Sequence, residues 1–401
     1  MPWRETTPME ERLRFVARRL EGESMTALCR EFGISRKTGH KLFARYKESG
    51  LEALGDRPRC PGRVANRLPM PVEAAIVALK KEKPHWGARK LRELLARRLG
   101  EGVPVPARST IHAVLDRYGL VEHARARRPR ATGTPLSTPA APNDLWCCDF
   151  KGEFRLGNRR LCYPLTVTDQ ASRYLLLVEA MEGTREPTVF TAFHRLFQER
   201  GLPLAIRSDV EPEVRLRRSG VPFASRGLYG LSRLSVWWLR LGIGLQRIKP
   251  GRPQQNGAHE RMHLTLKGQT TRPADETILA QQARFDAFLD EFNAERPHEA
   301  LAMKTPAELY TASARPYAGL PALRYPFHDH EAIVRRNGTI RLCGRTVVIS
   351  TVLDGQTLGL REVDTDVWLV SFMGYDLGYI DLEARTLQTI DTPFGSRVSP
   401  M

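Results

Sequence analysis

The pattern of hydrophobic and polar positions divides the 401-residue chain into helical, mixed and strand-rich stretches. Near the N-terminus, hydrophobic residues recur every three to four positions over residues 8–21, 25–32 and 36–46, which predicts three short helices. Ser35 is suited to cap the third helix, because its hydroxyl can accept a hydrogen bond from a free backbone amide. Three helices with a Gly-Ile-Ser turn before the last are typical of a helix-turn-helix unit. A generic three-helix bundle is the alternative.

A second helical pattern covers residues 72–81, 87–99 and 107–118 and predicts another unit that looks like a helix-turn-helix. Between the two units, residues 51–67 are rich in Pro, Gly and Arg and lack periodicity, so we expect an extended basic linker there. Residues 123–143 have a similar composition and predict a second flexible linker.

From residue 145 the pattern becomes that of a mixed α/β domain. Short β-prone runs lie at residues 145–154, 161–168, 173–180, 204–207 and 245–248. Helical patterns follow at residues 187–200 and 234–241, from Asn256 onwards, and at residues 285–294. After residue 326, five β-like runs separated by Gly turns predict a small separate β-barrel, SH3-like in size: 340–342, 345–349, 357–362, 367–372 and 379–381.

The charge of the chain points to a polyanionic partner. The formal net charge is +17. Residues 1–140 hold 29 Lys and Arg against 15 Asp and Glu, and 29 − 15 = +14, which is most of that total. A basic front half beside a nearly balanced rear half favours nucleic acid. No apolar run approaches the length of a membrane span, and the six cysteines show no paired metal spacing, so we expect no membrane partner and a cytoplasmic, nucleoid-associated location.

Acidic residues on separate predicted elements are the candidate chemistry. Asp149 lies on the first predicted strand of the α/β domain, Asp209 ends a later one, and Glu260 lies on the helix after the Pro250–Pro253 break. Carboxylates from separate elements can hold two divalent ions about 4 Å apart for phosphoryl transfer. The spacing places Asn256, Glu260, His263, Leu264 and Lys267 on one helix face. An ordinary solvated helix face is the alternative.

Several longer motifs carry a family resemblance. They are WCCDFKGEF, TDQASRYLL, IRSD, GVPFAS, GLSRLSVWWLRLGI, RIKPGRPQQNGAHERMH and RPHEAL. With them the whole chain resembles bacterial insertion-sequence transposases of the DDE type, which have a retroviral-integrase-like catalytic core of the RNase H fold. The PGRPQQNGAHERMH run is the most specific of these motifs.

The resemblance implies a transposase that binds terminal inverted repeats, cleaves DNA and integrates it by strand transfer. It implies that Asp149, Asp209 and Glu260 are the catalytic acids and hold two Mg²⁺ or Mn²⁺ ions. Its partners would be double-stranded repeat and target DNA, bound by a homodimer or higher oligomer. The expected DNA-binding residues are Arg36, Lys37, Thr38, His40, Lys41, Arg108, Ser109, Thr110, Asn256 and Lys267. Asp169 is interpreted as a structural turn residue, and His259 and His263 as DNA-facing or core residues rather than zinc ligands.

The predicted fold class is multidomain α/β, with N-terminal helix-turn-helix units, an RNase H-like catalytic core and a small C-terminal β-barrel. The predicted domains are a helix-turn-helix at 1–55, a basic linker at 56–70, a second helix-turn-helix-like domain at 71–120, a basic linker at 121–144, the catalytic core at 145–315 and the β-rich domain at 316–401.

One departure from the family pattern bears on activity. Ten residues, 210–219, follow Asp209 where one Asn is expected before Gly220. We expect an exposed loop there and a folded core with impaired chemistry, because displacing an acid by ~1 Å can cost on the order of a hundredfold in rate. The alternatives are therefore a catalytically impaired relative, a DNA-binding repressor of terminal repeats, and an RNase H-like nuclease without strand transfer.

Overall fold

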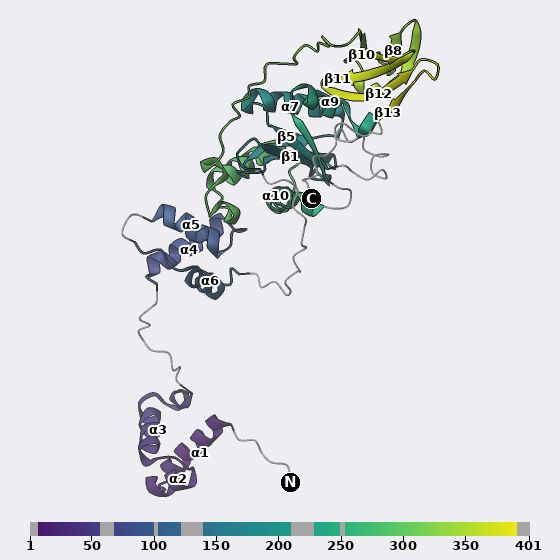
Figure 1. Cartoon of the computed structure of the whole chain (residues 1–401). Coiled ribbons are helices and arrows are strands. Elements are labelled where there is room, and N and C mark those ends of the chain that lie inside the picture. Colours follow the sequence, from purple (N-terminus) through teal and green to yellow (C-terminus); the bar gives the residue numbers. More distant parts are fainter. Residues whose placement is uncertain are drawn as a thin grey trace, which may run out of the picture. The chain divides into compact units, whose positions relative to one another are not determined.

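The chain folds into two compact units, Met1–Pro69 and Met70–Met401 (Figure 1). The computed structural model describes residues 7–56, 68–99, 103–121, 139–209, 228–248 and 253–390. The predicted loop at 210–219 and most of both predicted linkers lie outside these ranges. In the part of the chain that the structure describes, no helix combines the length and hydrophobicity needed to cross a membrane.

The first unit contains the three predicted helices, α1 Pro8–Leu20, α2 Met25–Glu31 and α3 Arg36–Ser49. Ser35 caps α3 as predicted, since its Oγ accepts a hydrogen bond from the Thr38 amide at 3.1 Å. The prediction that the linker begins at residue 51 is wrong. Leu51–Leu54 forms a short 3₁₀ helix, η1, whose Leu54 side chain is fully buried in the core of this unit. Burying that leucine is favourable enough to extend the folded unit past α3.

The second unit begins with three helices, α4 Met70–Glu82, α5 Ala88–Arg98 and α6 Arg108–Arg117. These helices pack against the α/β domain. Lys83 Nζ lies 3.1 Å from a Glu291 oxygen and 2.7 Å from a Glu295 oxygen. Trp86, which follows Lys83 closely in the chain, is only 1% exposed. The ion pairs raise the pKa of Lys83 against the opposing effect of burial, which indicates that the contact is partly desolvated.

A mixed sheet forms the centre of the α/β domain. Its strands are β1 Leu145–Phe150, β2 Phe154–Arg155, β3 Leu161–Asp169, β4 Leu175–Met181, β5 Ala205–Asp209 and β6 Gly244–Ile248. Their main order is β4-β3-β1-β5-β6, in which β4, β3 and β1 pair antiparallel while β5 and β6 continue in parallel with β1. That order confirms the predicted RNase H-like class.

Helices cover both faces of this sheet (Figure 1). On one face, α7 Glu186–Arg200 and α9 Arg233–Arg240 pack on a cluster that includes Trp146, Phe193 and Trp238. On the other face, α10 Gly257–Thr270 and α11 Ile278–Asp290 bury Met262, Leu266 and Phe285 against β3 and β4. A π-helical turn, Glu291–Glu295, and two 3₁₀ turns, Glu299–Leu301 and Pro306–Glu308, follow α11.

The C-terminal part is a seven-stranded sheet of order β7-β10-β11-β12-β13-β9-β8, whose end strands β7 and β8 contact each other, so that it forms a nearly closed barrel. Its strands are β7 His330–Ile333, β8 Thr339–Leu342, β9 Arg345–Val348, β10 Thr357–Asp364, β11 Val367–Phe372, β12 Tyr375–Asp381 and β13 Thr386–Thr389. The prediction of a small C-terminal β-barrel is confirmed, and the barrel packs on the α/β domain. Val236 and Leu239 of α9 are buried within the same hydrophobic cluster as the barrel residues.

Candidate active site

The sheet places positions 149 and 209 side by side. Strands β1 and β5 are parallel neighbours in which Cys148 pairs with Ser208, so the next residue on each strand stands at the same level. The β1 residues from Leu145 to Cys148 are buried, and Asp149 is the first half-buried position after them. Position 209 is the last residue of β5. Its side chain lies outside the described part of the structure, so the predicted role of Asp209 stays a prediction.

Helix α10 brings Glu260 to the same place. After β6 the chain turns through η3, Pro253–Asn256, and α10 begins at Gly257, where the sequence predicts a helix start. The Glu260 side chain is 44% exposed. One ligand atom each from Asp149, Glu260 and His263 lie within 4.8 Å of one another. The structure therefore joins two of the three predicted acids and adds a histidine.

A hydrogen-bond network under these acids fixes the histidine rings. The Thr166 hydroxyl donates to the Asp149 carbonyl oxygen at 3.0 Å and also lies 2.9 Å from His259 Nε2 and 2.7 Å from His263 Nε2. A hydroxyl has one proton to donate, so both Nε2 atoms carry hydrogen and donate to Thr166 Oγ1. It follows that His263 Nδ1 has a free lone pair, and this atom lies 3.9 Å from Glu260 Oε2.

Both histidines are neutral. His259 and His263 are 1% and 2% exposed, and burial lowers the pKa of His259 to about 3 and that of His263 well below its usual value. The Thr168 hydroxyl can donate to His259 Nδ1 at 2.7 Å, which completes the partners of that ring. The interpretation of His259 as a core residue therefore agrees with its position, while His263 has one nitrogen directed to the acids.

These residues fit a divalent cation. Two carboxylates with a third acid on the adjacent strand offer the oxygen ligands that Mg²⁺ and Mn²⁺ prefer, and a neutral imidazole nitrogen is a further donor. Because both histidines are neutral, neither ring adds positive charge beside the acids.

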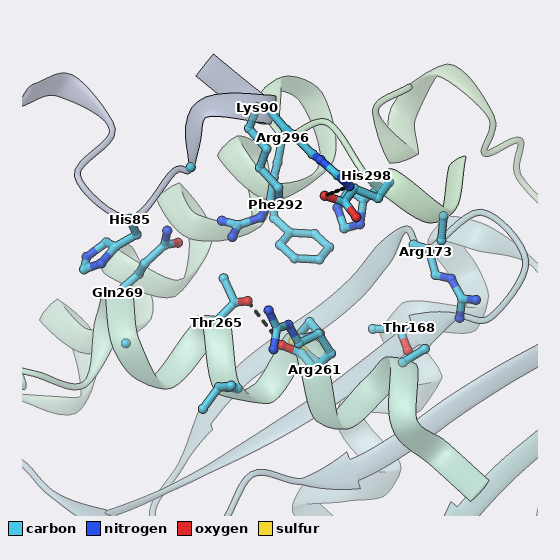
Figure 2. Close-up of a pocket in the computed structure, with 18 of the residues that line it drawn as sticks. His85, Lys90, Thr168, Arg173, Arg261, Thr265, Gln269, Phe292, Arg296 and His298 are labelled. Carbon is cyan, nitrogen blue, oxygen red and sulfur yellow. Dashed lines mark hydrogen bonds and ion pairs between the residues drawn. The ribbon is translucent and has the colours of Figure 1, made fainter. Parts of the chain in front are cut away.

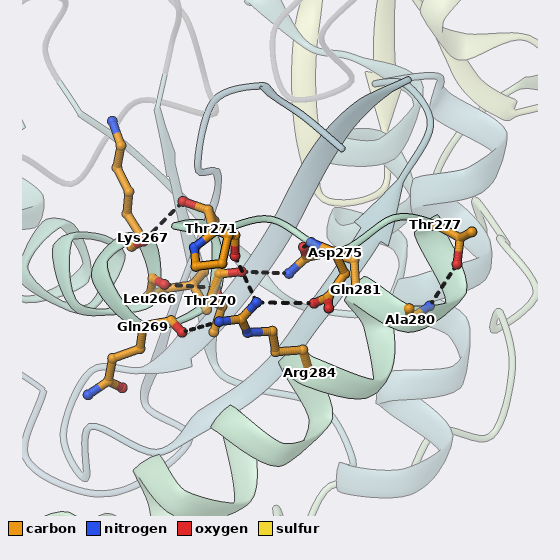
Figure 3. A network of polar contacts seen from close by, with 11 residues as sticks. Leu266, Lys267, Gln269, Thr270, Thr271, Asp275, Thr277, Ala280, Gln281 and Arg284 are labelled. Atoms are coloured by element: carbon orange, nitrogen blue, oxygen red, sulfur yellow. Dashed lines mark hydrogen bonds and ion pairs between the residues drawn. The ribbon is translucent and has the colours of Figure 1, made fainter. Parts of the chain in front are cut away.

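Buried polar contacts hold α10 at both ends. Arg207 of β5 is 2% exposed, and it donates to Gln246 Oε1 at 3.0 Å and to the Gln255 carbonyl at 3.3 Å just before α10. At the other end, Gln281 of α11 donates to the Thr270 carbonyl at 3.1 Å, and Arg284 donates to the Gln269 carbonyl at 3.2 Å (Figure 3). These contacts fix the position of Glu260 relative to the sheet.

The predicted DNA-binding residues fall into three groups. Arg36, Lys37, Thr38, His40 and Lys41 are all exposed along the first half of α3. Arg108 and Ser109 are exposed at the start of α6, with Thr110 half-buried. Lys267 is exposed on α10, whereas Asn256 is 2% exposed, and its Oδ1 has no hydrogen-bond partner among the described residues.

One predicted face of α10 is wrong. Leu264 is 60% exposed and does not share a face with His263, because the helix turns it away from the sheet by about 100° per residue. Asp169, in contrast, is the structural residue that the sequence predicts. It is fully buried, and its carboxylate accepts hydrogen bonds from the Ser172 amide and hydroxyl and from the Asn143 amide.

Two contributors to the site were missed. Thr166 and Arg207 act on residues far away in the sequence, and neither lies in a pattern that distinguishes it from other strand residues. The histidine pair had a usable signal, since His259 and His263 are four residues apart and flank Glu260 on one helix.

Family models match four parts of the chain: a helix-turn-helix domain at residues 11–62, a homeodomain-like domain at 38–115, and an integrase core domain at 139–253 and again at 241–306. Two curated relatives are similar along most of their length. A 31.7 kDa protein of insertion element IS407 from Burkholderia multivorans is 29% identical over 62% of this chain and 83% of its own. A 39.2 kDa protein of insertion element IS476 from Xanthomonas euvesicatoria is 26% identical over 72% of this chain and 79% of its own.

Solved structures are similar at lower identity. The HTLV-2 integrase catalytic core domain in complex with magnesium is 15% identical, with a TM-score of 0.32, over 43% of this chain and 99% of that one. A simian T-cell lymphotropic virus intasome chain is 15% identical, with a TM-score of 0.36, over 75% of this chain and 97% of that one.

Proposed function

We propose that this chain, which is similar to insertion-element proteins and has helix-turn-helix domains before an integrase core, is a transposase that cuts DNA at terminal inverted repeats and joins the freed 3′-hydroxyl to target DNA. The observation that carries this proposal is the convergence of Asp149, Glu260 and His263 within 4.8 Å, beside position 209 on the neighbouring strand. Only this cluster argues for chemistry, because a DNA-binding repressor would need the helical domains alone.

Asp149, Glu260 and Asp209 would hold two Mg²⁺ or Mn²⁺ ions. When bound, such ions lower the pKa of a water nucleophile and stabilise charge on the attacking and leaving oxygens of a phosphodiester. In this chain, His263 Nδ1 can accept a hydrogen bond from a water beside Glu260, because Thr166 keeps the proton of that ring on Nε2. The contacts of Arg207 and Gln281 keep α10, and with it Glu260, at a fixed place over the sheet.

DNA would be held outside the acid cluster. The exposed basic side chains of α3 suit phosphates and base edges, and Lys267 follows Glu260 by two helical turns. We expect a homodimer or higher oligomer on DNA, because the two ends of an element must be joined together.

Substituting single acids tests the proposal. Asp149→Asn and Glu260→Gln should each abolish Mg²⁺-dependent cleavage of a terminal-repeat duplex while leaving its binding intact. Glu199→Gln, at an exposed acid on α7, is the matched control and should cleave at the parent rate. Undiminished cleavage by either active-site variant would overturn the assignment, and a parent protein that binds repeats without cutting them would favour the repressor.

A further inference from the structure

A large basic cavity lies apart from the acid cluster, where α5 and α6 face the α/β domain (Figure 2). Its volume is about 1030 Å³, at the upper limit of the sizes usual for small-molecule sites. The residues before α5, the first turn of α5 and the first two turns of α6 line one side. The turn after β3, the outer face of α10 and the segment from Phe292 to Ala300 line the other.

Arg89 and Arg108 line this cavity together with four further cationic side chains. These four are Lys90 of α5, Arg173 after β3, Arg261 of α10 and Arg296. Asp169 and Glu299 are the acids among the described lining residues. Asp169 is saturated by Ser172 and Asn143, and Glu299 lies 2.8 Å from Arg89. Glu299 and Glu291 partly offset the charge of Lys90, and Asp169 partly offsets that of Arg173. Cations still outnumber acids among the described lining residues, so the cavity favours an anion.

Buried nitrogens face the cavity without hydrogen-bond partners among the described residues. They are Arg173 Nη1, Arg296 Nη1 and His298 Nε2. Arg296 is 8% exposed, and its guanidinium lies over the rings of Trp86 and Phe292, which hold it in place. Figure 2 shows Arg296 and Lys90 above the Phe292 ring, with Arg173 across the cavity. The site is therefore a fixed set of donors.

The electrostatics agree with this geometry. Burial, together with the charges of Arg296 and Arg261, lowers the pKa of Lys90 to about 7. Burial, with Lys90, Arg296 and Arg173 nearby, lowers the pKa of His298 to about 3. The charges of Arg296 and Arg261 therefore act on Lys90, and those of Lys90, Arg296 and Arg173 act on His298, as the shared cavity requires.

We propose that this cavity binds phosphate groups, and that these belong to the backbone of DNA held at the start of α6. Arg108, Ser109 and His112, from the first two turns of α6, line the same cavity, so a strand contacting α6 has its phosphates next to Lys90 and Arg296. The DNA source rests on the proposed function. Phosphate binding itself rests only on the cations and unpartnered nitrogens.

Two measurements on the full chain test the proposal. The first is thermal unfolding with and without inorganic pyrophosphate, which requires no transposase activity. The second is the affinity for a duplex DNA over a range of salt concentrations. The variants are Lys90→Gln, the partly buried group, and Arg261→Gln, whose side chain is exposed on α10 and whose loss leaves the core intact. Arg185→Gln, at an exposed residue before α7, is the control with the same charge change.

Pyrophosphate should raise the melting temperature of the parent and of Arg185→Gln, and the rise should be lost in both cavity variants. Both variants should also bind duplex DNA about tenfold more weakly, with a shallower dependence on salt, because one fewer phosphate contact releases one fewer counter-ion. If the variants lose the pyrophosphate effect but bind DNA like the parent, the source is a free phosphate compound and the DNA assignment is overturned. If pyrophosphate stabilises all four proteins equally or none of them, the site itself is overturned.

Discussion

Thr166 is the residue on which the arrangement of the site depends most. Its single hydroxyl joins the backbone at Asp149 to both buried histidines, and in doing so it sets which nitrogen of His263 faces Glu260. Thr166 thereby determines the donor and acceptor pattern of the residues that we propose to hold the metal ions.

Replacing Thr166 with Val keeps the side-chain shape and removes this hydroxyl. Two buried histidine nitrogens would then lack a partner, so we expect a loss of about 1–3 kcal/mol in the free energy of unfolding. Cleavage should fall more than the stability loss explains at a temperature where the variant is folded. Chemical denaturation and single-turnover cleavage measure the two effects. Ser at position 166 should restore both, and failure of that rescue would contradict the role of the hydroxyl.

Acid should destabilise the second unit through His259. Its pKa is about 3 when folded and about 6.5 when unfolded, so below pH 6.5 the unfolded chain takes up a proton that the folded chain does not. The contribution of neutral His259 to the free energy of unfolding is therefore fully present above pH 6.5. It is lost as the pH falls towards 3, at up to about 1.4 kcal/mol per pH unit. Urea unfolding between pH 7 and 4.5 measures the slope. His259→Gln should flatten it, whereas His194→Gln, at an exposed histidine, should not.

At the scale of elements, α3 packs unusually closely on its neighbours. A Cβ added to Gly39 would lie 2.4 Å from Cys29 Sγ and 3.0 Å from Met25 Sδ, both in the core of the first unit. The glycine therefore lets α3 approach α2 while the exposed side of α3 carries the basic residues.

Gly39→Ala should destabilise the first unit. The helix gains about 1 kcal/mol from alanine, but overpacking of this kind costs about 1–3 kcal/mol, and the contact distance favours the upper part of that range. Unfolding of the full chain followed by a probe in residues 7–56 measures the change. Adding Cys29→Ala removes the sulfur and should recover part of the loss. An unchanged midpoint for Gly39→Ala would show that the helix shifts freely.

Elements with long periodic patterns and caps could be predicted from the sequence. The first three helices begin at the residues where the sequence pattern predicts them, and Ser35 caps α3, because these signals are local. Strands β2, β7 and β13 were missed since each has only two to four residues and forms by pairing with partners elsewhere in the chain. The cavity could not be predicted for the same reason. Lys90 and Arg296 lie more than 200 positions apart, and only the packing of the α4–α6 helices on the α/β domain brings them together.

For the whole molecule, the division of charge predicts where sequence recognition takes place. Arg36→Ala and Lys37→Ala, on the exposed side of α3, should each weaken terminal-repeat binding by about 1–3 kcal/mol if the side chain reads a base, with little change in binding to random DNA. A phosphate contact would instead weaken both DNAs alike and reduce the salt slope. Titration of both DNAs at several salt concentrations separates these cases. Equal binding of repeat and random DNA by the parent would contradict recognition by this unit.

Val236 and Leu239 of α9 belong to the hydrophobic cluster of the barrel, whereas Leu234 and Trp238 of the same helix belong to the cluster on the sheet. One helix thus belongs to two hydrophobic interiors at once. A fragment that ends before the barrel would expose the hydrophobic side chains Val236 and Leu239 of α9, and we expect it to aggregate. Recombination between related elements would meet the same obstacle, because a tail from one protein could join the core of another only if α9 came with it. We therefore expect the α/β domain and the barrel to be exchanged between related proteins as one segment.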